Sequence, residues 1–133
     1  MDIQKLYRIF LNSNGVSTDT RTLQKGTLFF ALNGPNFDGN QYAKNAIEKG
    51  ASFVVVDKLE SIELSSQVIF VKNTLTVLQE LATHHRKILN IPIIAITGSN
   101  GKTTTKELIR KVLSEKFNVL ATKGNFNNHI GVP

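Results

Sequence analysis

Hydrophobic residues form two kinds of pattern along residues 1–89, a helical spacing and continuous runs. In residues 3–11 they stand three and four positions apart, which predicts an amphipathic helix. Asp2 suits the N-cap of this helix, and the polar run 12–15 predicts its end. The same helical spacing returns over 74–89 and stops before Pro92. Each helix is therefore expected to turn one apolar face toward a core.

Continuous apolar runs mark the expected strands. They lie at 27–32, 53–56 and 68–71. Runs without polar alternation are typical of strands that are buried on both faces. The turn residues of 34–39 predict a loop, after which Asn40 is expected to cap a short helix that ends at Gly50. This alternation of strands and helices predicts a small α/β domain over residues 1–72.

A second α/β pattern occupies the rest of the chain. The apolar run 93–96 predicts a strand, TGSNGKTTTK follows it, and helical spacing continues over 102–116. One more strand is predicted at 119–122. Because a doubly wound nucleotide-binding sheet usually has about five or six strands, residues 73–133 are expected to be the beginning of a larger domain. The chain is therefore interpreted as a piece of a longer protein.

The glycines and lysine of TGSNGKTTTK indicate a phosphate-binding loop. In such loops backbone N–H groups surround the phosphates, the lysine reaches the β/γ oxygens and a hydroxyl completes a Mg²⁺ shell. The longer form of the motif would need a glycine where Ile96 stands, so this is a shortened form. An ordinary strand–turn–helix is the alternative, but helix starts favour acidic residues over lysine. The expected ATP-binding residues are Gly98, Ser99, Asn100, Gly101, Lys102, Thr103 and Thr104.

Charge and composition restrict the classes of partner. Sixteen basic and ten acidic residues give a net charge of +6, but the basic residues are scattered among acids, which does not favour nucleic acid. No apolar run approaches the roughly 20 residues of a membrane span, and the N-terminus lacks the pattern of a signal peptide. The absence of cysteine excludes disulfides and agrees with a cytoplasmic protein.

Three stretches resemble the Mur ligase family of peptidoglycan assembly. They are STDTR (17–21) followed by KGTLFFALNGPNFDGNQYAKNAIEKGA, TGSNGKTTTKE (97–107), and TKGNFNNHIGVP (122–133). The first resembles the UDP-sugar-binding N-terminal domain, and the second resembles the shortened phosphate loop of the family. The third is most similar to members that add D-alanyl-D-alanine, whereas members that add the third amino acid usually carry a threonine-rich segment there.

This resemblance implies an ATP-dependent ligase with Mg²⁺ as cofactor. It would join D-alanyl-D-alanine to UDP-N-acetylmuramoyl-tripeptide in the cytoplasm through an acyl phosphate. Lys102 is the expected catalytic residue, and the Thr103 hydroxyl is the expected metal ligand. The third-amino-acid-adding enzyme and a non-catalytic UDP-sugar-binding module remain the alternatives. The chain alone is not expected to turn over, because the other catalytic parts of the family lie beyond Pro133.

The resemblance also implies a substrate site, made mostly of short polar side chains. The expected substrate-binding residues are Thr18, Thr20, Pro35, Asn36, Phe37, Asn125, Asn127 and Asn128. Asp19 and Arg21 either join this site or form an ion pair that fixes a turn. Adjacent histidines on a helix cannot face one metal, so His84 and His85 are assigned packing or solvent roles. His129 either contacts substrate or faces solvent.

Overall fold

The computed structural model describes residues 2–60, 62–63 and 65–122 of the chain. The chain forms two compact units, Met1–Leu89 and Asn90–Pro133. No helix within the described ranges is both long and apolar enough to cross a membrane.

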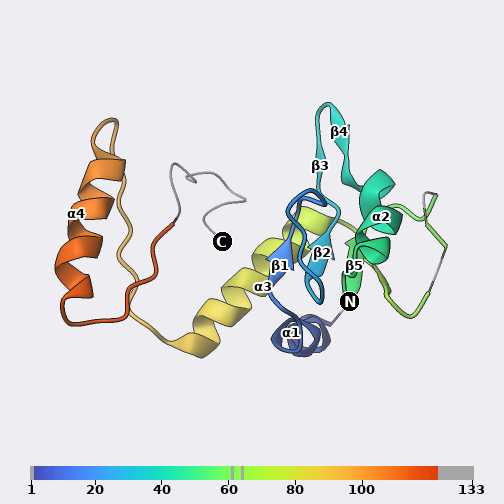
Figure 1. The fold of residues 1–133 in the computed structure, drawn as a ribbon, viewed down its shortest axis with the longest axis horizontal. Helices are drawn as coiled ribbons and strands as arrows, with labels where there is room; N and C mark the ends of the chain where they lie inside the picture. The colour runs from blue at the N-terminus through green and yellow to red at the C-terminus, as the bar shows by residue number, and fades with distance from the viewer. Residues whose placement is uncertain (1, 61, 64, 123–133) are drawn as a thin grey trace. The chain divides into compact units, whose positions relative to one another are not determined.

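The first unit is built on a parallel sheet of four strands in the order β1-β2-β5-β6 (Figure 1). The strands are β1 (Val16–Ser17), β2 (Leu28–Phe30), β5 (Phe53–Val56) and β6 (Val68–Phe70). The three strands expected from the apolar runs are therefore confirmed, as is the α/β class. Strand β1 was not predicted, because two residues are too short to show a periodic pattern.

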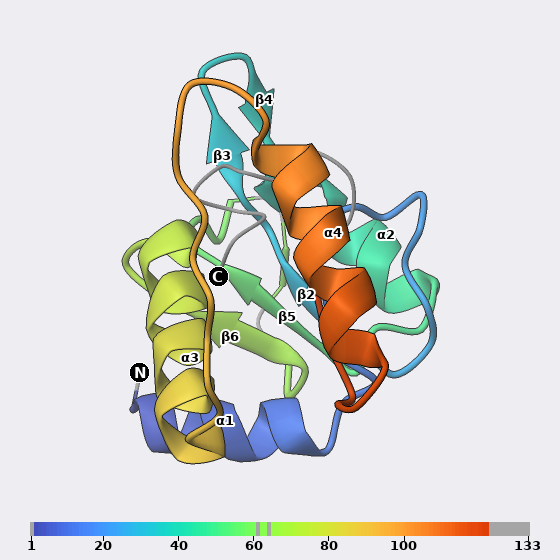
Figure 2. The same cartoon turned by 90° about the vertical axis from the view of Figure 1, so that its left-hand side faces the viewer.

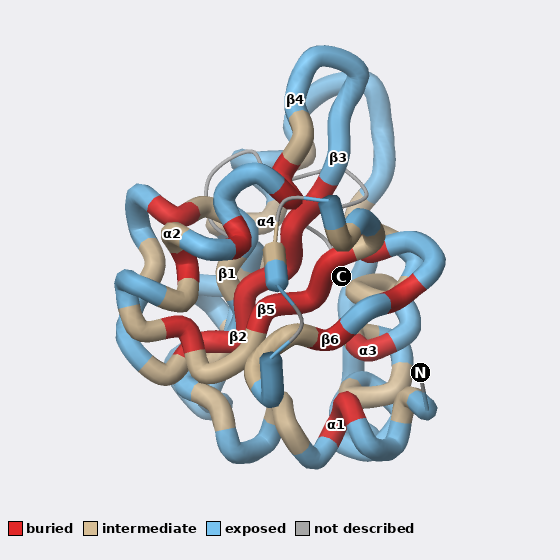
Figure 3. The backbone as a smooth tube through the Cα atoms, turned by 90° about the vertical axis from the view of Figure 1, so that its right-hand side faces the viewer, coloured by how far each residue is buried: buried red, intermediate tan, exposed pale blue. Residues whose placement is uncertain are grey.

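Helices cover both faces of this sheet (Figure 2). Helices α1 (Ile3–Leu11) and α3 (Thr74–Leu89) pack on one face, and α2 (Ala43–Glu48) packs on the other. Successive residues of a strand point to opposite faces. Phe30 and Val55 therefore belong to the core under α1 and α3, whereas the neighbouring residues of their strands belong to the core under α2. The centre of the sheet is buried on both sides, as Figure 3 shows in red.

Helix α1 begins and ends where the sequence predicts. The Asp2 carboxylate accepts a hydrogen bond of 2.9 Å from the Gln4 backbone N–H, and Asn12 is the C-cap. Helix α3 packs against α1 through Leu75, Leu78 and Leu81. The first compact unit thus includes α3, which the sequence analysis assigned to the second domain. The predicted division into domains at residues 72 and 73 stays a prediction.

The segment 34–39, expected to be an irregular loop, contains a short β-hairpin. Its strands are β3 (Asn33–Gly34) and β4 (Phe37–Asp38), which pair antiparallel and project beyond the end of β2 (Figure 1). A 3₁₀ helix, η1 (Gly39–Tyr42), joins the hairpin to α2. The prediction that Asn40 caps this region was wrong, because the Asp38 side chain is the cap and accepts a 3.0 Å bond from the Asn40 N–H.

The second unit contains helix α4 (Lys102–Ser114), close to its predicted range. The strands predicted at 93–96 and 119–122 are not formed. A strand requires a hydrogen-bonded neighbour, and in the described part of this unit no segment supplies one. The apolar side chains of these runs are accordingly exposed, to 60% at Ile94 and 97% at Leu120.

Candidate functional site

The carboxyl ends of the four strands meet at one edge of the first unit's sheet. Thr18 follows β1, Asn33 lies just past β2, Asp57 follows β5, and Thr74 begins α3 shortly after β6. In open parallel sheets ligands bind outside this edge. Chain direction alone therefore places four polar residues where a ligand site is expected.

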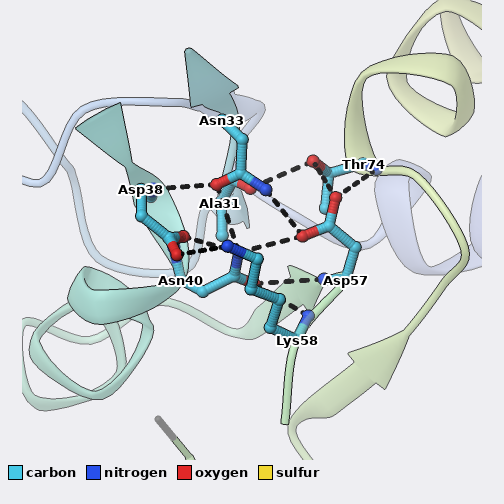
Figure 4. Close-up of polar contacts among 8 residues, drawn as sticks. Ala31, Asn33, Asp38, Asn40, Asp57, Lys58 and Thr74 are labelled. Atoms are coloured by element: carbon cyan, nitrogen blue, oxygen red, sulfur yellow. Dashed lines mark hydrogen bonds and ion pairs between the residues drawn. The ribbon is translucent and has the colours of Figure 1, made fainter. Parts of the chain in front are cut away.

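Asn40 is the centre of a hydrogen-bond network at this edge (Figure 4). Its side chain is completely buried. The amide nitrogen lies 2.8 Å from Asp38 Oδ1, 2.9 Å from Asp57 Oδ1 and 3.2 Å from Asn33 Oδ1. The amide oxygen accepts from the backbone N–H groups of Asp57, at 3.1 Å, and Lys58, at 3.2 Å. One buried side chain thus joins the base of the hairpin to the end of β5.

Asp57 extends the network across the sheet edge. Its Oδ1 also accepts a 2.8 Å bond from the Asn33 amide nitrogen. Its Oδ2 faces the Thr74 backbone N–H and hydroxyl, both at 3.3 Å, and that hydroxyl lies 3.0 Å from the Ala31 carbonyl oxygen. Among the described residues, no buried side-chain nitrogen or oxygen lacks a partner. A fully satisfied buried network holds its members in one arrangement.

Gly39 allows the chain to leave the hairpin against the end of β2. A Cβ atom at this position would lie 2.3 Å from the Leu32 carbonyl oxygen and 2.8 Å from the Ala31 carbonyl carbon. Backbone atoms cannot give way as a flexible side chain can. Any side chain here would therefore push the hairpin away from the sheet.

Lys58 forms an ion pair with Asp38 of the network. Lys58 Nζ donates to Asp38 Oδ2 at 2.6 Å. This bond, followed by that from Asn40, lowers the pKa of the Asp38 carboxyl from 3.8 to about 2. Asp38 is therefore a carboxylate at neutral pH, and the positive Lys58 is held beside the hairpin.

The hairpin borders an open depression of about 460 Å³. It is lined by Asn33, Gly34, Pro35, Asn36, Phe37, Asp38, Gln41, Tyr42 and Lys58. The Phe37 and Tyr42 rings stack with centroids 5.4 Å apart and planes inclined by 14°. Both rings are substantially exposed, Phe37 to 52% and Tyr42 to 42%. Exposed aromatic faces beside amide and ammonium groups suit a ligand with a flat ring and polar edges.

The predicted substrate residues are only partly brought together. Pro35, Asn36 and Phe37 line the depression, whereas Thr18 and Thr20 do not. Thr18 is exposed in the loop after β1, and Thr20 is buried with its carbonyl oxygen accepting a 2.8 Å bond from Lys49 Nζ.

The turn after β1 contains an ion pair between Asp19 and Arg21, which was one of the two roles considered for them. The Arg21 Nε lies 3.0 Å from each Asp19 carboxylate oxygen, and its Nη2 lies 2.6 Å from Oδ2. The Arg21 side-chain bond, followed by that of its backbone N–H, lowers the Asp19 pKa to about 2. The pair therefore shapes this turn at neutral pH.

The other predicted positions lie elsewhere. Tyr7 contacts both His84 and His85. Its hydroxyl lies 3.1 Å from His85 Nδ1, and its ring packs edge-on against His84. Of the two roles considered for the histidines, packing or solvent, the structure shows packing against Tyr7. Four positions of the third motif lie outside the described residues: Asn125, Asn127, Asn128 and His129.

Sequence reasoning missed six of the lining residues: Asn33, Gly34, Asp38, Gln41, Tyr42 and Lys58. Lys58 carried a usable signal, because it follows a predicted strand and so belongs near the carboxyl edge. Tyr42 did not, because an aromatic residue in a short helix is expected to pack inward, whereas Tyr42 is exposed and stacks on Phe37.

The phosphate-loop motif lies in the second unit, directly before α4. Gly101 is the N-cap and has φ +75°, a left-handed conformation that favours glycine. Lys102 Nζ donates to the carbonyl oxygens of Gly98, at 2.5 Å, and Ser99, at 3.4 Å. The ammonium group is thereby held over the turn that precedes the helix.

The chemistry of this turn fits a nucleotide phosphate. The glycine cap supplies no side-chain acceptor for the first turn of α4, and that turn contains no acidic residue. A helix N-terminus of this kind attracts anions. Among the described residues, no heavy atom beyond those of Gly101 and its two chain neighbours would lie within 4 Å of a Cβ at this position, so the backbone is open to a close ligand. The exposed Thr103 could offer its hydroxyl to Mg²⁺, a hard cation that prefers oxygen.

Two family models match the chain and together cover most of it. The model for the Mur ligase family catalytic domain matches residues 12–92, and the Mur ligase middle domain matches residues 96–133. The two matches meet close to the division between the compact units.

Curated relatives align over nearly the whole chain. UDP-N-acetylmuramoyl-tripeptide–D-alanyl-D-alanine ligase of Bacillus subtilis (strain 168) is 46% identical over 121 residues, and the same-named ligase of Escherichia coli (strain K12) is 42% identical over 120. Each alignment covers 90% of this chain and 26% of the relative. The chain therefore spans about a quarter of the length of these relatives.

Solved structures give the same picture. The MurF ligase from Thermotoga maritima in complex with ADP has a TM-score of 0.79 at 28% identity, covering 92% of this chain and 28% of its own. A UDP-N-acetylmuramoyl-L-alanyl-D-glutamate–2,6-diaminopimelate ligase has a TM-score of 0.50 at 25% identity, covering 78% of this chain and 22% of its own.

Proposed function

Since the chain belongs to the Mur ligase family, we propose that it is part of an ATP-dependent ligase that joins D-alanyl-D-alanine to UDP-N-acetylmuramoyl-tripeptide. The observation that carries this proposal is the 46% identity to a relative of that name over 90% of the chain. The reaction belongs to peptidoglycan precursor synthesis, and we assign it to the cytoplasm.

The first unit would bind the UDP end of the muramoyl substrate. The depression beside the hairpin offers the ring of Phe37 to the uracil, and the Asn36 amide can both donate and accept at the base edges. Thr18 and Thr20 stay part of the proposed substrate site, on the loop that follows β1 at the same edge of the sheet. Asn125, Asn127 and Asn128 are assigned to the substrate by resemblance alone.

The phosphate loop would bind ATP. Gly98, Ser99, Asn100, Gly101 and Thr104 would surround the phosphates with backbone N–H and hydroxyl groups. Lys102 would neutralise the charge that develops when a substrate carboxylate oxygen attacks the γ-phosphorus and ADP leaves. The amine of the dipeptide would then attack the acyl carbon, and inorganic phosphate would leave. The Thr103 hydroxyl would help hold Mg²⁺, which supplies further charge neutralisation at the phosphates.

The amine specificity separates the proposed ligase from the third-amino-acid-adding alternative. The full-length enzyme that contains this chain is incubated with ATP and one of two substrate pairs. The first pair is UDP-N-acetylmuramoyl-tripeptide with D-alanyl-D-alanine, and the second is UDP-N-acetylmuramoyl-dipeptide with a third amino acid. We expect ADP release and a new amide product with the tripeptide plus D-alanyl-D-alanine. Product formed only from UDP-N-acetylmuramoyl-dipeptide and a third amino acid would contradict the proposal. Substrate binding without ADP release would instead favour a non-catalytic UDP-sugar-binding module.

A further inference from the structure

The hairpin that borders the depression is too small to hold its own position. Its ladder contains two residue pairs, Asn33 with Asp38 and Gly34 with Phe37. A two-stranded hairpin is marginal in water even when it is longer. Its tip residues, Pro35 and Asn36, are exposed and contribute nothing to the core. Whatever fixes the hairpin must therefore act at its base.

Asn40 bonds to both base residues and to the sheet. Its amide nitrogen faces carboxylate or amide oxygens of Asn33, Asp38 and Asp57, the first two of which form the basal pair of the hairpin. Its amide oxygen faces the N–H groups of Asp57 and Lys58 at the end of β5. Only this orientation of the amide matches donors with acceptors on both sides. No hydrophobic residue of similar size could make these five contacts.

We infer that Asn40 is a positioning residue, which fixes the β3–β4 hairpin on the carboxyl end of β5 so that Phe37 faces the substrate. Asn40 itself does not line the depression. It acts through the hairpin, and the Gly39 contact with Leu32 keeps the hairpin close to the sheet. This inference rests on the proposed substrate site, because its effect on activity depends on Phe37 contacting substrate.

Asn40→Asp is the sharpest variant. It has the same shape but turns an oxygen toward the carboxylates of Asp38 and Asp57, so three hydrogen bonds become repulsive or lost. Asn40→Ser, which replaces the amide with a single shorter hydroxyl, serves if Asn40→Asp does not fold. Thr27→Val is the matched control, because it removes a buried hydroxyl bonded at 2.9 Å to the Gln24 carbonyl, before β2 and away from the depression.

The first readout is amide hydrogen exchange of the full-length protein without ligand. We expect exchange at residues 33–38 to become about tenfold faster or more in Asn40→Asp, since an unpaired buried polar group is costly. In Thr27→Val this segment should keep its wild-type rate. Equal exchange of the segment in the two variants would overturn the inference.

The second readout is steady-state kinetics of the same variants. We expect KM for the UDP-muramoyl substrate to rise roughly three- to tenfold, with kcat and KM for ATP near wild type, as for lost uniform binding. In the double variant Asn40→Asp/Phe37→Ala, the increase in the free-energy cost that KM reports should be smaller than the sum of the two single effects, because Asn40 acts through Phe37.

The two readouts separate the inference from the proposed function. In one outcome, exchange at residues 33–38 rises in Asn40→Asp and Phe37→Ala raises KM, but the Asn40 variants leave KM unchanged. The site then works without Asn40, and the inference is overturned. If exchange rises and neither Asn40→Asp nor Phe37→Ala changes KM, Asn40 still fixes the hairpin. The assignment of the depression to the substrate then fails.

Discussion

Phe37 and Tyr42 stack on each other although they come from different elements, β4 and η1. Their ring centroids are 5.4 Å apart, and both rings remain open to solvent. Apolar groups that are exposed together beside a depression suit contact with a ligand. We therefore expect this pair to contact the proposed substrate.

Replacing Phe37 tests that role. We expect Phe37→Ala in the full-length enzyme to raise KM for the UDP-muramoyl substrate roughly three- to tenfold, since an aromatic contact contributes ~0.5–1.5 kcal/mol. KM for ATP should stay the same. Phe70→Ala is the matched control, because Phe70 is 51% exposed but does not line the depression. Equal effects of the two variants would contradict a specific role for Phe37.

Lys102 should be essential for turnover. We expect Lys102→Ala to lower kcat by at least about a hundredfold, because a group that stabilises transition-state charge commonly contributes ~3 kcal/mol or more. The fold should persist, since Lys102 is not buried and its bonds to Gly98 and Ser99 stay within its own loop. Lys111→Ala, at an exposed position near the end of the same helix, should leave kcat unchanged. Near-normal turnover in Lys102→Ala would show that another group neutralises the phosphates.

The Asp38–Lys58 pair predicts a dependence on pH. The Asp38 pKa of about 2 lies below the 3.8 of an unpaired carboxyl, so the pair stabilises the folded state fully above about pH 4. That contribution is lost as the pH falls toward about 2. Carboxyl-detected NMR titration of the chain should show the Asp38 pKa rising toward 3.8 in Lys58→Ala. Asp19, whose pKa is lowered mainly by Arg21, is the internal control and should not move.

A ligand titration tests whether the two halves of the predicted substrate site form one site. We expect UDP-muramoyl tripeptide, added to the 133-residue chain, to shift the NMR signals of Asn36 and Phe37 together with those of Thr18 and Thr20. The affinity should be weak, because the chain spans only about a quarter of the length of its relatives and so offers the substrate fewer contacts. Shifts confined to the hairpin would remove the two threonines from the site. No shift anywhere in 17–40 would remove the site itself.

Much of the first unit followed from the sequence alone. The apolar runs 27–32 and 53–56 predict strands buried on both faces, and the stripe of residues 3–11 predicts a helix that covers one face, because apolar area tends to leave water whatever the details of packing. The phosphate loop was equally readable, since its glycines and lysine are adjacent in the chain. Local patterns of this kind need no knowledge of distant neighbours.

What the tertiary structure decided depends on residues that meet across the sheet. Asn40 reads as a helix cap in the sequence, yet it is buried because parallel pairing of β2 and β5 carries Asp57 and Lys58 to the same edge. Conversely, the run 93–96 reads as a buried strand but forms none, because strand formation requires a hydrogen-bonded partner and the described part of its unit contains none. Sequence pattern specifies which residues must be buried, whereas strand register specifies which polar groups meet there.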